Sequence, residues 1–449
     1  MVTSAPARPP FAIRARILTP LATGGTRYEA DGRIDVDTRG VIGRVGPWRD
    51  EPDEPDAAGS GPPLDLRPLV LLPGMVDLHV HLPQLPNAGV GAGLHLLDWL
   101  ERYIFPLERA FDEAAAERLA PAAYRAFAAA GTTTAVMYGA VYEPSLEIAF
   151  RAAEAHGIRA VIGKVMMDRG SYDHRLPPDR VLETSLRQSA DLCGRWHGRD
   201  GGRLRYAFTP RFAVSCSADM LRESAALARS TGAYWQTHLS EDHDELHAVA
   251  RLHPDAIDYL DVYDRAGGLG PHAIMAHAIH LSAREVGRLA ETGTAVAHCP
   301  ASNLFLASGA MRLAHYQAAG IRVGLGSDVS AGPDLSVFTN MRAGAYTQSG
   351  LHVLAEGHGP EPLDPLDWLR LGTLDGARAL GMDGEIGTLE VGKEADMIAV
   401  DPRLVAPIEG IDSHDPAEIM SRLAFRPHPD MVRAAWVRGR RLDGPPGLA

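Results

Sequence analysis

Eight short apolar runs follow one another between residues 69 and 380, and each precedes a stretch with helical periodicity. Runs rich in β-branched residues that alternate with helical stretches of roughly 10 to 20 residues are typical of parallel strand–helix units. Eight consecutive units predict a closed (β/α)8 barrel of the TIM type, because the alternative, a doubly wound open sheet, rarely has so many. The runs cover residues 75–81, 132–137, 159–167, 204–209, 234–238, 273–277, 294–298 and 322–327.

Glycines mark the predicted ends of helices in this region. The helical patterns over residues 146–156 and 218–231 stop directly before Gly157 and Gly232. Glycine readily adopts the left-handed backbone conformation that closes many helices. Both positions therefore support the strand–helix repeat.

The two ends of the chain differ from its middle because both contain short strand patterns. An acidic, proline- and glycine-rich run, 48–63, is expected to be a solvated loop. We expect residues 1–68 and 381–449 to form one composite β-sandwich beside a barrel of residues 69–380, since neither end alone could cover its apolar face. The predicted strands are residues 11–21, 33–37, 40–46, 387–389, 395–400 and 434–438.

The net charge argues against polyanionic partners. The chain has 44 basic and 57 acidic residues, which gives a formal net charge of −13. Such a charge repels phosphate backbones and anionic membrane surfaces. We therefore expect a small-molecule substrate and neither nucleic acid nor membrane as a partner.

Cysteine usage and the N-terminal residues bear on the compartment. Cys193, Cys216 and Cys299 are far apart and form no C-x-x-C pair, which argues against a disulfide framework and a cysteine zinc site. The first residues lack the basic and apolar regions of a signal peptide, and no run reaches about 18 apolar residues. These features favour a cytoplasmic protein.

Two histidines lie in the first strand of the predicted barrel. Side chains alternate between the faces of a strand, so Asp77, His79 and His81 share one face. His81 falls at the carboxyl end of the strand, where barrel enzymes have their sites. Two histidines in a strand are more often core or surface residues, so this pair alone does not predict a metal site.

Three further strands also end in groups that bind metals. His238, His277 and Asp328 come at the ends of the fifth, sixth and eighth runs, and such ends meet at one mouth of a barrel. The chain has 19 histidines, so some could fall at these positions by chance, but chance would not favour the ends of strands over helices and loops. Imidazole and carboxylate groups suit a d10 ion. The sequence therefore predicts one divalent metal, with zinc expected and iron as the alternative.

An acidic residue three positions after His238 is a candidate general acid/base. Glu241 would lie beside the predicted metal, where a carboxyl group can move protons. It also begins an acidic run, 241–245, which could serve only to stabilise the start of a helix. Motifs of other enzymes are absent from the sequence: the P-C-x-x-C of cytidine-type deaminases, the phosphate-binding loop and the G-x-S-x-G nucleophile turn.

These motifs together resemble the amidohydrolase superfamily, in the subtype with one divalent metal and no carbamylated lysine. The closing segment, residues 384–396, is similar to the second β segment of the same superfamily. Within it, longer stretches resemble the guanine deaminase family, and the resemblance spans nearly the whole chain. These stretches are residues 81–84, 96–100, 105–108, 209–212, 236–241 and 297–303.

The resemblance implies a role for each motif residue. The metal ligands would be His79, His81, His238 and Asp328. Asp328 would also take a proton from the attacking water and pass it to the leaving amine. Glu241 would protonate the ring nitrogen next to the attacked carbon. His277 would orient the water, and a fifth metal ligand is the alternative for it.

The implied reaction is the hydrolysis of guanine to xanthine and ammonia. Arg211 supplies fixed donors for a carbonyl oxygen, and the amide of Gln84 can donate and accept along the same edge. Phe212 and Trp99 would pack against the ring or wall the pocket, although Trp99 could be ordinary core. The alternatives are a related enzyme for 8-oxoguanine, a pterin or an aminotriazine, and a barrel that has lost catalysis. The family's habit predicts a homodimer.

Overall fold

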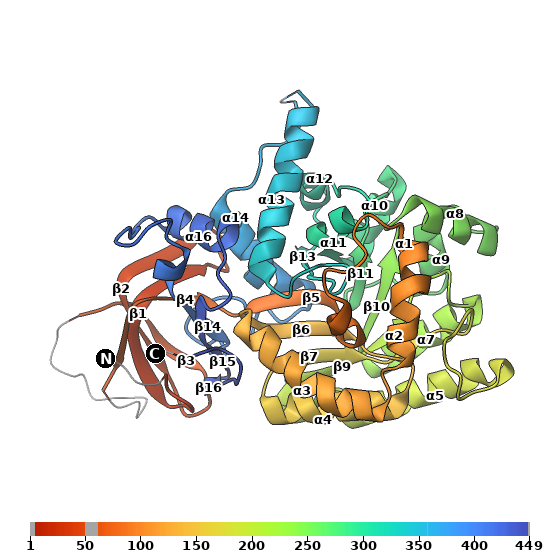
Figure 1. The fold of residues 1–449 in the computed structure, drawn as a ribbon, viewed down its shortest axis with the longest axis horizontal. Coiled ribbons are helices and arrows are strands. Elements are labelled where there is room, and N and C mark those ends of the chain that lie inside the picture. Colours follow the sequence, from red (N-terminus) through yellow and green to blue (C-terminus); the bar gives the residue numbers. More distant parts are fainter. Residues whose placement is uncertain (1–4, 50–61, 357, 448–449) are drawn as a thin grey trace.

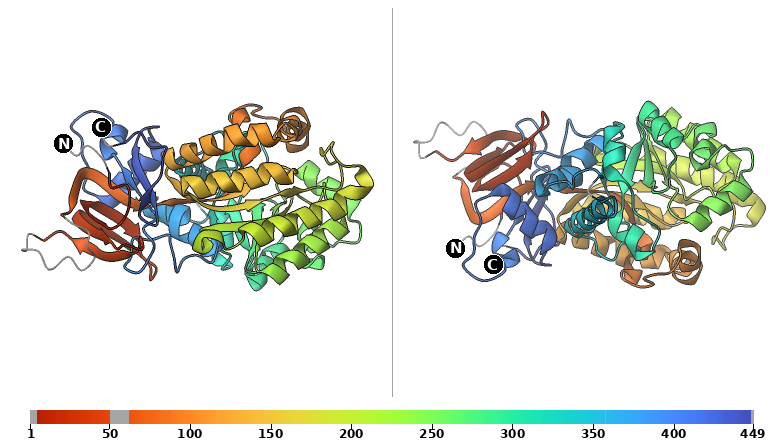
Figure 2. Two further views of the ribbon diagram at one scale, coloured as in Figure 1. Left: turned by 90° about the horizontal axis from the view of Figure 1, so that it is seen from below. Right: turned by 90° about the horizontal axis from the view of Figure 1, so that it is seen from above.

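The computed structural model describes residues 5–49, 62–356 and 358–447. A barrel surrounded by helices lies beside a twisted sheet, and both chain ends lie on the side of the sheet (Figure 1). Two further views show the same arrangement (Figure 2). Most of the predicted loop, residues 50–61, lies outside the described residues.

Parallel strands form the barrel in the order in which they occur along the chain. They pair side by side from β5 to β13, and β13 contacts β5, so the sheet is nearly closed. This confirms the predicted barrel. The third run differs, because it is interrupted at Lys164 and gives two strands that both pair with the fourth. The strands are β5 (Met75–His81), β6 (Thr132–Tyr138), β7 (Arg159–Gly163), β8 (Val165–Met166), β9 (Leu204–Pro210), β10 (Tyr234–Leu239), β11 (Ala273–His277), β12 (Ala295–His298) and β13 (Val323–Leu325).

The helices between these strands end close to where the sequence predicts. α4 (Glu143–His156) and α7 (Ala218–Thr231) are closed by Gly157 and Gly232, whose φ angles are 97° and 70°. α4 begins three residues earlier than predicted, because a proline suits the first turn of a helix. The other helices around the barrel include α3 (Glu113–Ala129), α5 (Pro178–Trp196), α8 (His243–Leu252), α10 (Ala283–Thr292) and α13 (Val337–Leu354).

The two ends of the chain share one sheet, in the order β16-β15-β14-β4-β1-β2-β3. Its central strand, β4, pairs with β1 from the N-terminal segment and with β14 from the C-terminal segment. The predicted composite β unit is therefore present, while the exact domain boundaries stay a prediction. The strands are β1 (Phe11–Pro20), β2 (Thr26–Val36), β3 (Ile42–Pro47), β4 (Leu64–Pro73), β14 (Met397–Val400), β15 (Val432–Val437) and β16 (Arg440–Arg441).

One predicted strand, residues 387–389, is wrong. This segment is irregular, and Gly387 has a φ of 92°, outside the strand region. The backbone N–H of Leu389 donates to the hydroxyl oxygen of Thr19 at 2.8 Å. A side chain therefore provides the partner that a neighbouring strand would otherwise supply.

A buried arginine joins the barrel to the sheet. Arg159, in β7, is fully buried, and its Nε donates to Asp396 at 2.9 Å. A second contact reaches Glu394, which lies in the same C-terminal segment. The guanidinium therefore depends on carboxylates that the C-terminal segment supplies. None of the helices in the described part of the chain is long and apolar enough to cross a membrane.

Candidate active site

Side chains from four barrel strands meet in one buried cluster. His79 and His81 come from β5, His238 from β10 and His277 from β11, while Asp328 follows β13. All five side chains are buried. His238 contributes to one group of potential metal-binding atoms with His79 and His277, and Asp328 to another with His79 and His81.

The distances within this cluster suit a metal ion. Asp328 Oδ1 lies 3.2 Å from His79 Nε2 and 3.3 Å from His81 Nε2, and His81 Nε2 lies 3.2 Å from His238 Nε2. Tetrahedral zinc with bonds of about 2.0 to 2.1 Å separates its ligand atoms by about 3.3 Å. The spacing of these four atoms therefore fits one ion of this kind.

Hydrogen bonds fix which ring nitrogen faces the cluster. The Nδ1 of His238 lies 2.7 Å from the carbonyl oxygen of Arg211, so it carries the proton and Nε2 has the free lone pair. The Nδ1 of His277 is paired in the same way with Asn303 Oδ1 at 2.9 Å. The Nε2 atoms of His79 and His277 are buried without hydrogen-bond partners. Buried polar atoms are seldom left unpaired, so these two positions suit a bound metal ion or water.

The protonation states of these side chains favour metal binding. Burial lowers the pKa of His81 to about 4 and that of His238 well below its usual value. Burial would raise the pKa of Asp328, but the facing His79 and His81 outweigh it and hold that pKa well below its usual range. Neutral imidazole and ionised carboxylate are the forms that bind metals.

Glu241 faces this cluster rather than the neighbouring helix. Its Oε2 lies 3.3 Å from His277 Nε2. Burial, and then the charge of Asp328, raises its pKa well above the usual value. α8 is capped by Asp242 and Glu245, which form a capping box. The helix-end role is therefore filled by other residues, and the carboxyl group of Glu241 is available for chemistry.

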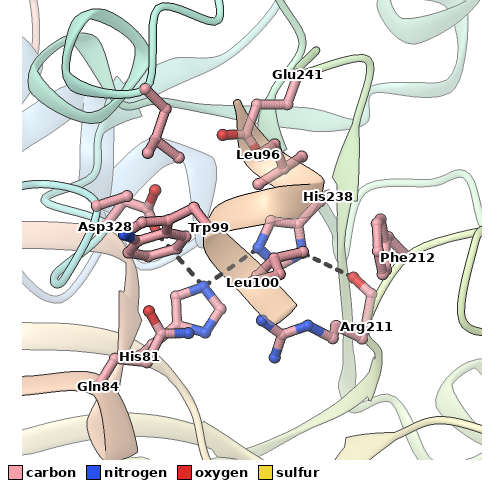
Figure 3. Close-up of a pocket in the computed structure, with 12 residues that line it drawn as sticks. His81, Gln84, Leu96, Trp99, Leu100, Arg211, Phe212, His238, Glu241 and Asp328 are labelled. Atoms are coloured by element: carbon pink, nitrogen blue, oxygen red, sulfur yellow. Dashed lines mark hydrogen bonds and ion pairs between the residues drawn. The ribbon is translucent and has the colours of Figure 1, made fainter. Parts of the chain in front are cut away.

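A pocket opens onto the cluster beneath an apolar cover (Figure 3). The cover includes Trp99 of α1 (Leu96–Trp99) and Leu100 of η2 (Leu100–Ile104). Trp99 packs with Phe212 in one apolar cluster, so it is both pocket wall and core. The space between its atoms amounts to about 340 Å³ when the open solvent at the mouth is included. The lining residues are His81, Gln84, Leu96, Trp99, Leu100, Arg211, Phe212, His238, Glu241, Leu306, Asp328 and Ala331.

The four residues that the sequence suggests for substrate binding, Gln84, Trp99, Arg211 and Phe212, all line this pocket. A further residue, Glu108, was not assigned a role from the sequence. It is completely buried, and its carboxylate accepts hydrogen bonds from Arg211 Nη1 at 2.6 and 2.7 Å and from Gln84 Nε2 at 2.7 Å. Burial would lower the pKa of Arg211, but Glu108 raises it.

Tyr138 is a second residue that the sequence interpretation missed. It ends β6, and its ring centroid lies 4.7 to 4.9 Å from those of His79, His81 and His238. The predicted strand stopped one residue earlier. Extending the strand by one residue would have revealed Tyr138 as another strand-end side chain. Ser302, in a motif quoted for the resemblance, donates its hydroxyl to Asp328 Oδ2 at 2.6 Å.

Comparisons with known proteins agree with this geometry. The amidohydrolase family is matched over residues 70–442. A probable guanine deaminase of Deinococcus radiodurans is 36% identical over 417 residues, which cover 91% of this chain and 92% of that protein. The solved structure of E. coli guanine deaminase has a TM-score of 0.87 and 31% identity, and 96% of this chain and 99% of that chain are covered. A guanine deaminase of C. acetobutylicum with bound guanine has a TM-score of 0.86 and 26% identity, with the same coverage.

Proposed function

Because the chain belongs to the amidohydrolase family, among its guanine deaminases, we propose that it hydrolyses guanine to xanthine and ammonia. It is a hydrolase that acts on a C–N bond. One observation carries the proposal: metal-type ligands, a carboxyl group of raised pKa and a carbonyl-binding guanidinium line one buried pocket.

The metal is assigned to His79, His81, His238 and Asp328, whose ligand atoms lie 3.2 to 3.3 Å apart in three pairs. Three imidazoles and one carboxylate favour zinc, with iron as the alternative. A divalent ion held by these residues would lower the pKa of bound water toward about 7, which would make a nucleophile available at neutral pH.

Three residues move or hold protons. Asp328 accepts the proton of the attacking water and passes it to the leaving amine, while the Ser302 hydroxyl holds its Oδ2 in place. Glu241 protonates the ring nitrogen beside the attacked carbon and recovers a proton from the new hydroxyl group as the amine leaves, and its raised pKa suits this exchange at neutral pH. His277 orients the attacking water through Nε2, because its Nδ1 is engaged by Asn303.

The base is oriented at the far side of the pocket from Glu241. Arg211 donates to the carbonyl oxygen of guanine, and Gln84 binds the same edge. Phe212 and Trp99 enclose the ring from its faces, in an apolar cluster that excludes water.

The test is ammonia release by the purified protein on guanine, 8-oxoguanine, adenine, cytosine, pterins and aminotriazines. Guanine should have the highest kcat/KM. A higher kcat/KM for a pterin or an aminotriazine would show that this related heterocycle, and not guanine, is the substrate. Ammonia release from none of them would favour a barrel that has lost catalysis.

We also propose a homodimer in the cytoplasm that acts in purine catabolism and binds neither nucleic acid nor membranes. α13 extends away from the body of the molecule (Figure 1). It exposes Tyr346, Val353 and Leu354, and such apolar side chains are typical of subunit contacts. Light scattering should give twice the chain mass, and Val353→Ser with Leu354→Ser should shift it toward the monomer. A monomeric parent protein would contradict the assignment.

A further inference from the structure

A buried carboxylate lies behind the substrate-binding side chains. Glu108 belongs to α2 (Phe105–Arg109) and is 0% exposed. Its Oε1 accepts hydrogen bonds from both Gln84 Nε2 and Arg211 Nη1, and its Oε2 accepts a second one from the same Nη1. The reaction proposed above assigns no role to this residue.

The carboxylate determines which end of the Gln84 amide is available. An ionised carboxylate only accepts hydrogen bonds, so the amide must turn its NH2 group toward Glu108. The carbonyl oxygen of Gln84 then lies on the other side, where the N–H and the hydroxyl of Ser330 approach it only to 3.4 Å. Gln84 is thereby held with its acceptor on this side, where a donor of the substrate can replace one of these two long hydrogen bonds from Ser330.

The same carboxylate fixes and neutralises Arg211. Both of its contacts are made by Nη1, so the rest of the guanidinium can donate to a ligand. A buried guanidinium without a counter-charge would attract an anion, whereas the pair is neutral. The described geometry therefore matches an uncharged ring edge on which a carbonyl oxygen lies beside an N–H.

We propose that Glu108 is a positioning residue that sets substrate selectivity, by holding Arg211 as the donor and Gln84 as the acceptor for an uncharged carbonyl and N–H edge. The inference rests on the proposed function, because guanine presents this edge. If the parent protein does not turn over guanine, the proposed function fails. The role of Glu108 is decided by the variants below, with the best substrate of the panel in place of guanine.

The first test compares Glu108→Gln with Glu101→Gln, an exposed glutamate in the neighbouring η2 segment. Glu108→Gln should raise KM for guanine about 10- to 100-fold, because hydrogen bonds to charged groups are strong. kcat should change much less, and Glu101→Gln should behave like the parent. An unchanged KM in Glu108→Gln would overturn the proposal.

Inhibition by xanthine separates positioning from simple damage to the fold. Above the first ionisation of xanthine, the base is an anion, which the pocket of Glu108→Gln should accept better because one negative charge is gone. The ratio of the xanthine inhibition constant to KM for guanine should therefore fall. A structural defect would weaken both ligands equally and leave the ratio unchanged, which would contradict the proposal.

A double-mutant cycle provides the third test. In the Arg211→Met background, which should hardly turn over guanine, no guanidinium remains to be held. Adding Glu108→Gln should therefore change the dissociation constant of neutral xanthine much less than it does in the parent. Equal effects in both backgrounds would contradict the proposal. If Glu108→Gln does not fold, Glu108→Asp replaces it in the cycle. This variant keeps the negative charge but moves the carboxylate away from Arg211 and Gln84 by the length of one methylene group.

Discussion

The imidazole of His238 and the backbone carbonyl of Arg211 are joined by a hydrogen bond of 2.7 Å. His238 is a proposed metal ligand, and the side chain of Arg211 points toward the proposed substrate position. One residue therefore supports the metal site through its backbone and the substrate site through its side chain. The two functions can be separated by substitution, because changing the side chain leaves the carbonyl in place.

Arg211→Met should abolish guanine deamination without loss of metal. A site built for a polar partner can lose about 10⁴- to 10⁵-fold in discrimination when that partner is missing. For the same reason, the parent should hardly use adenine, which has an amine in place of the carbonyl. Steady-state kinetics and elemental analysis provide the measurements. Guanine turnover at the parental rate would show that Arg211 does not contact the substrate.

Chelation should remove activity together with one metal ion per chain. The four proposed ligands form a closed buried set, and removing the ion also leaves His79 Nε2 without a partner. The melting temperature should therefore fall, since a ligand that binds only the folded state stabilises it. Elemental analysis and thermal unfolding before and after dialysis against a chelator test this. Full activity in metal-free protein would exclude the assignment.

Glu241→Gln should lower kcat by about 10²- to 10⁴-fold, the usual contribution of a general acid/base. The amide cannot transfer the proton, yet it keeps the size of the side chain and leaves the metal ligands untouched. Asp244→Asn is the matched control, because Asp244 is exposed in the same acidic run. Near-parental turnover in Glu241→Gln would reduce Glu241 to a structural residue.

Lys164→Met should stabilise the protein below pH 8. Burial lowers the pKa of Lys164 to about 8 from 10.5. Below pH 8 the folded chain must hold a buried charge, a penalty of about 3 kcal/mol at 1.4 kcal/mol per pKa unit. Between pH 8 and 10.5 the folded chain loses this proton before the unfolded chain does, so the penalty fades. Urea unfolding at neutral pH and at about pH 10 should show that the free energy of unfolding gained by the variant becomes smaller as the pH rises. A gain that does not depend on pH would contradict this prediction.

Arg159→Met should destabilise the folded state strongly. Removing one partner of a buried ion pair typically costs about 3 to 5 kcal/mol, and here it leaves Asp396 without its 2.9 Å donor. Arg151→Met is the control, because its pair with Glu147 is exposed and should be worth at most about 1 kcal/mol. Denaturant unfolding of both variants gives the comparison, and equal losses would argue against a special role for Arg159.

The barrel could be predicted from the sequence because its signal is local. Residues 75–81 and 273–277 have the predicted bounds, since each is a short run that the fold buries completely. The strand predicted over residues 387–389 was wrong because the hydrogen-bond partner of this segment, Thr19, lies 370 positions away. No strand propensity within a short segment contains that information.

The candidate site was partly predictable for a similar reason. Strand periodicity places His79, His81 and His238 at one mouth once the barrel is accepted. Glu108 lies in the stretch 105–108 that carries part of the resemblance, but its role could not be recognised, because its partners lie 24 and 103 positions away. From sequence alone it resembles a surface residue of a short helix.

The position of β4 between β1 and β14 also has a consequence for biosynthesis. The ribosome delivers β4 early, but β14, which covers its second edge, emerges more than three hundred residues later. An unpaired strand edge attracts other strands, and domains usually assemble as units during synthesis. The nascent chain therefore carries an open edge throughout the translation of the barrel, and its sheet can be completed only when β14, β15 and β16 have been made.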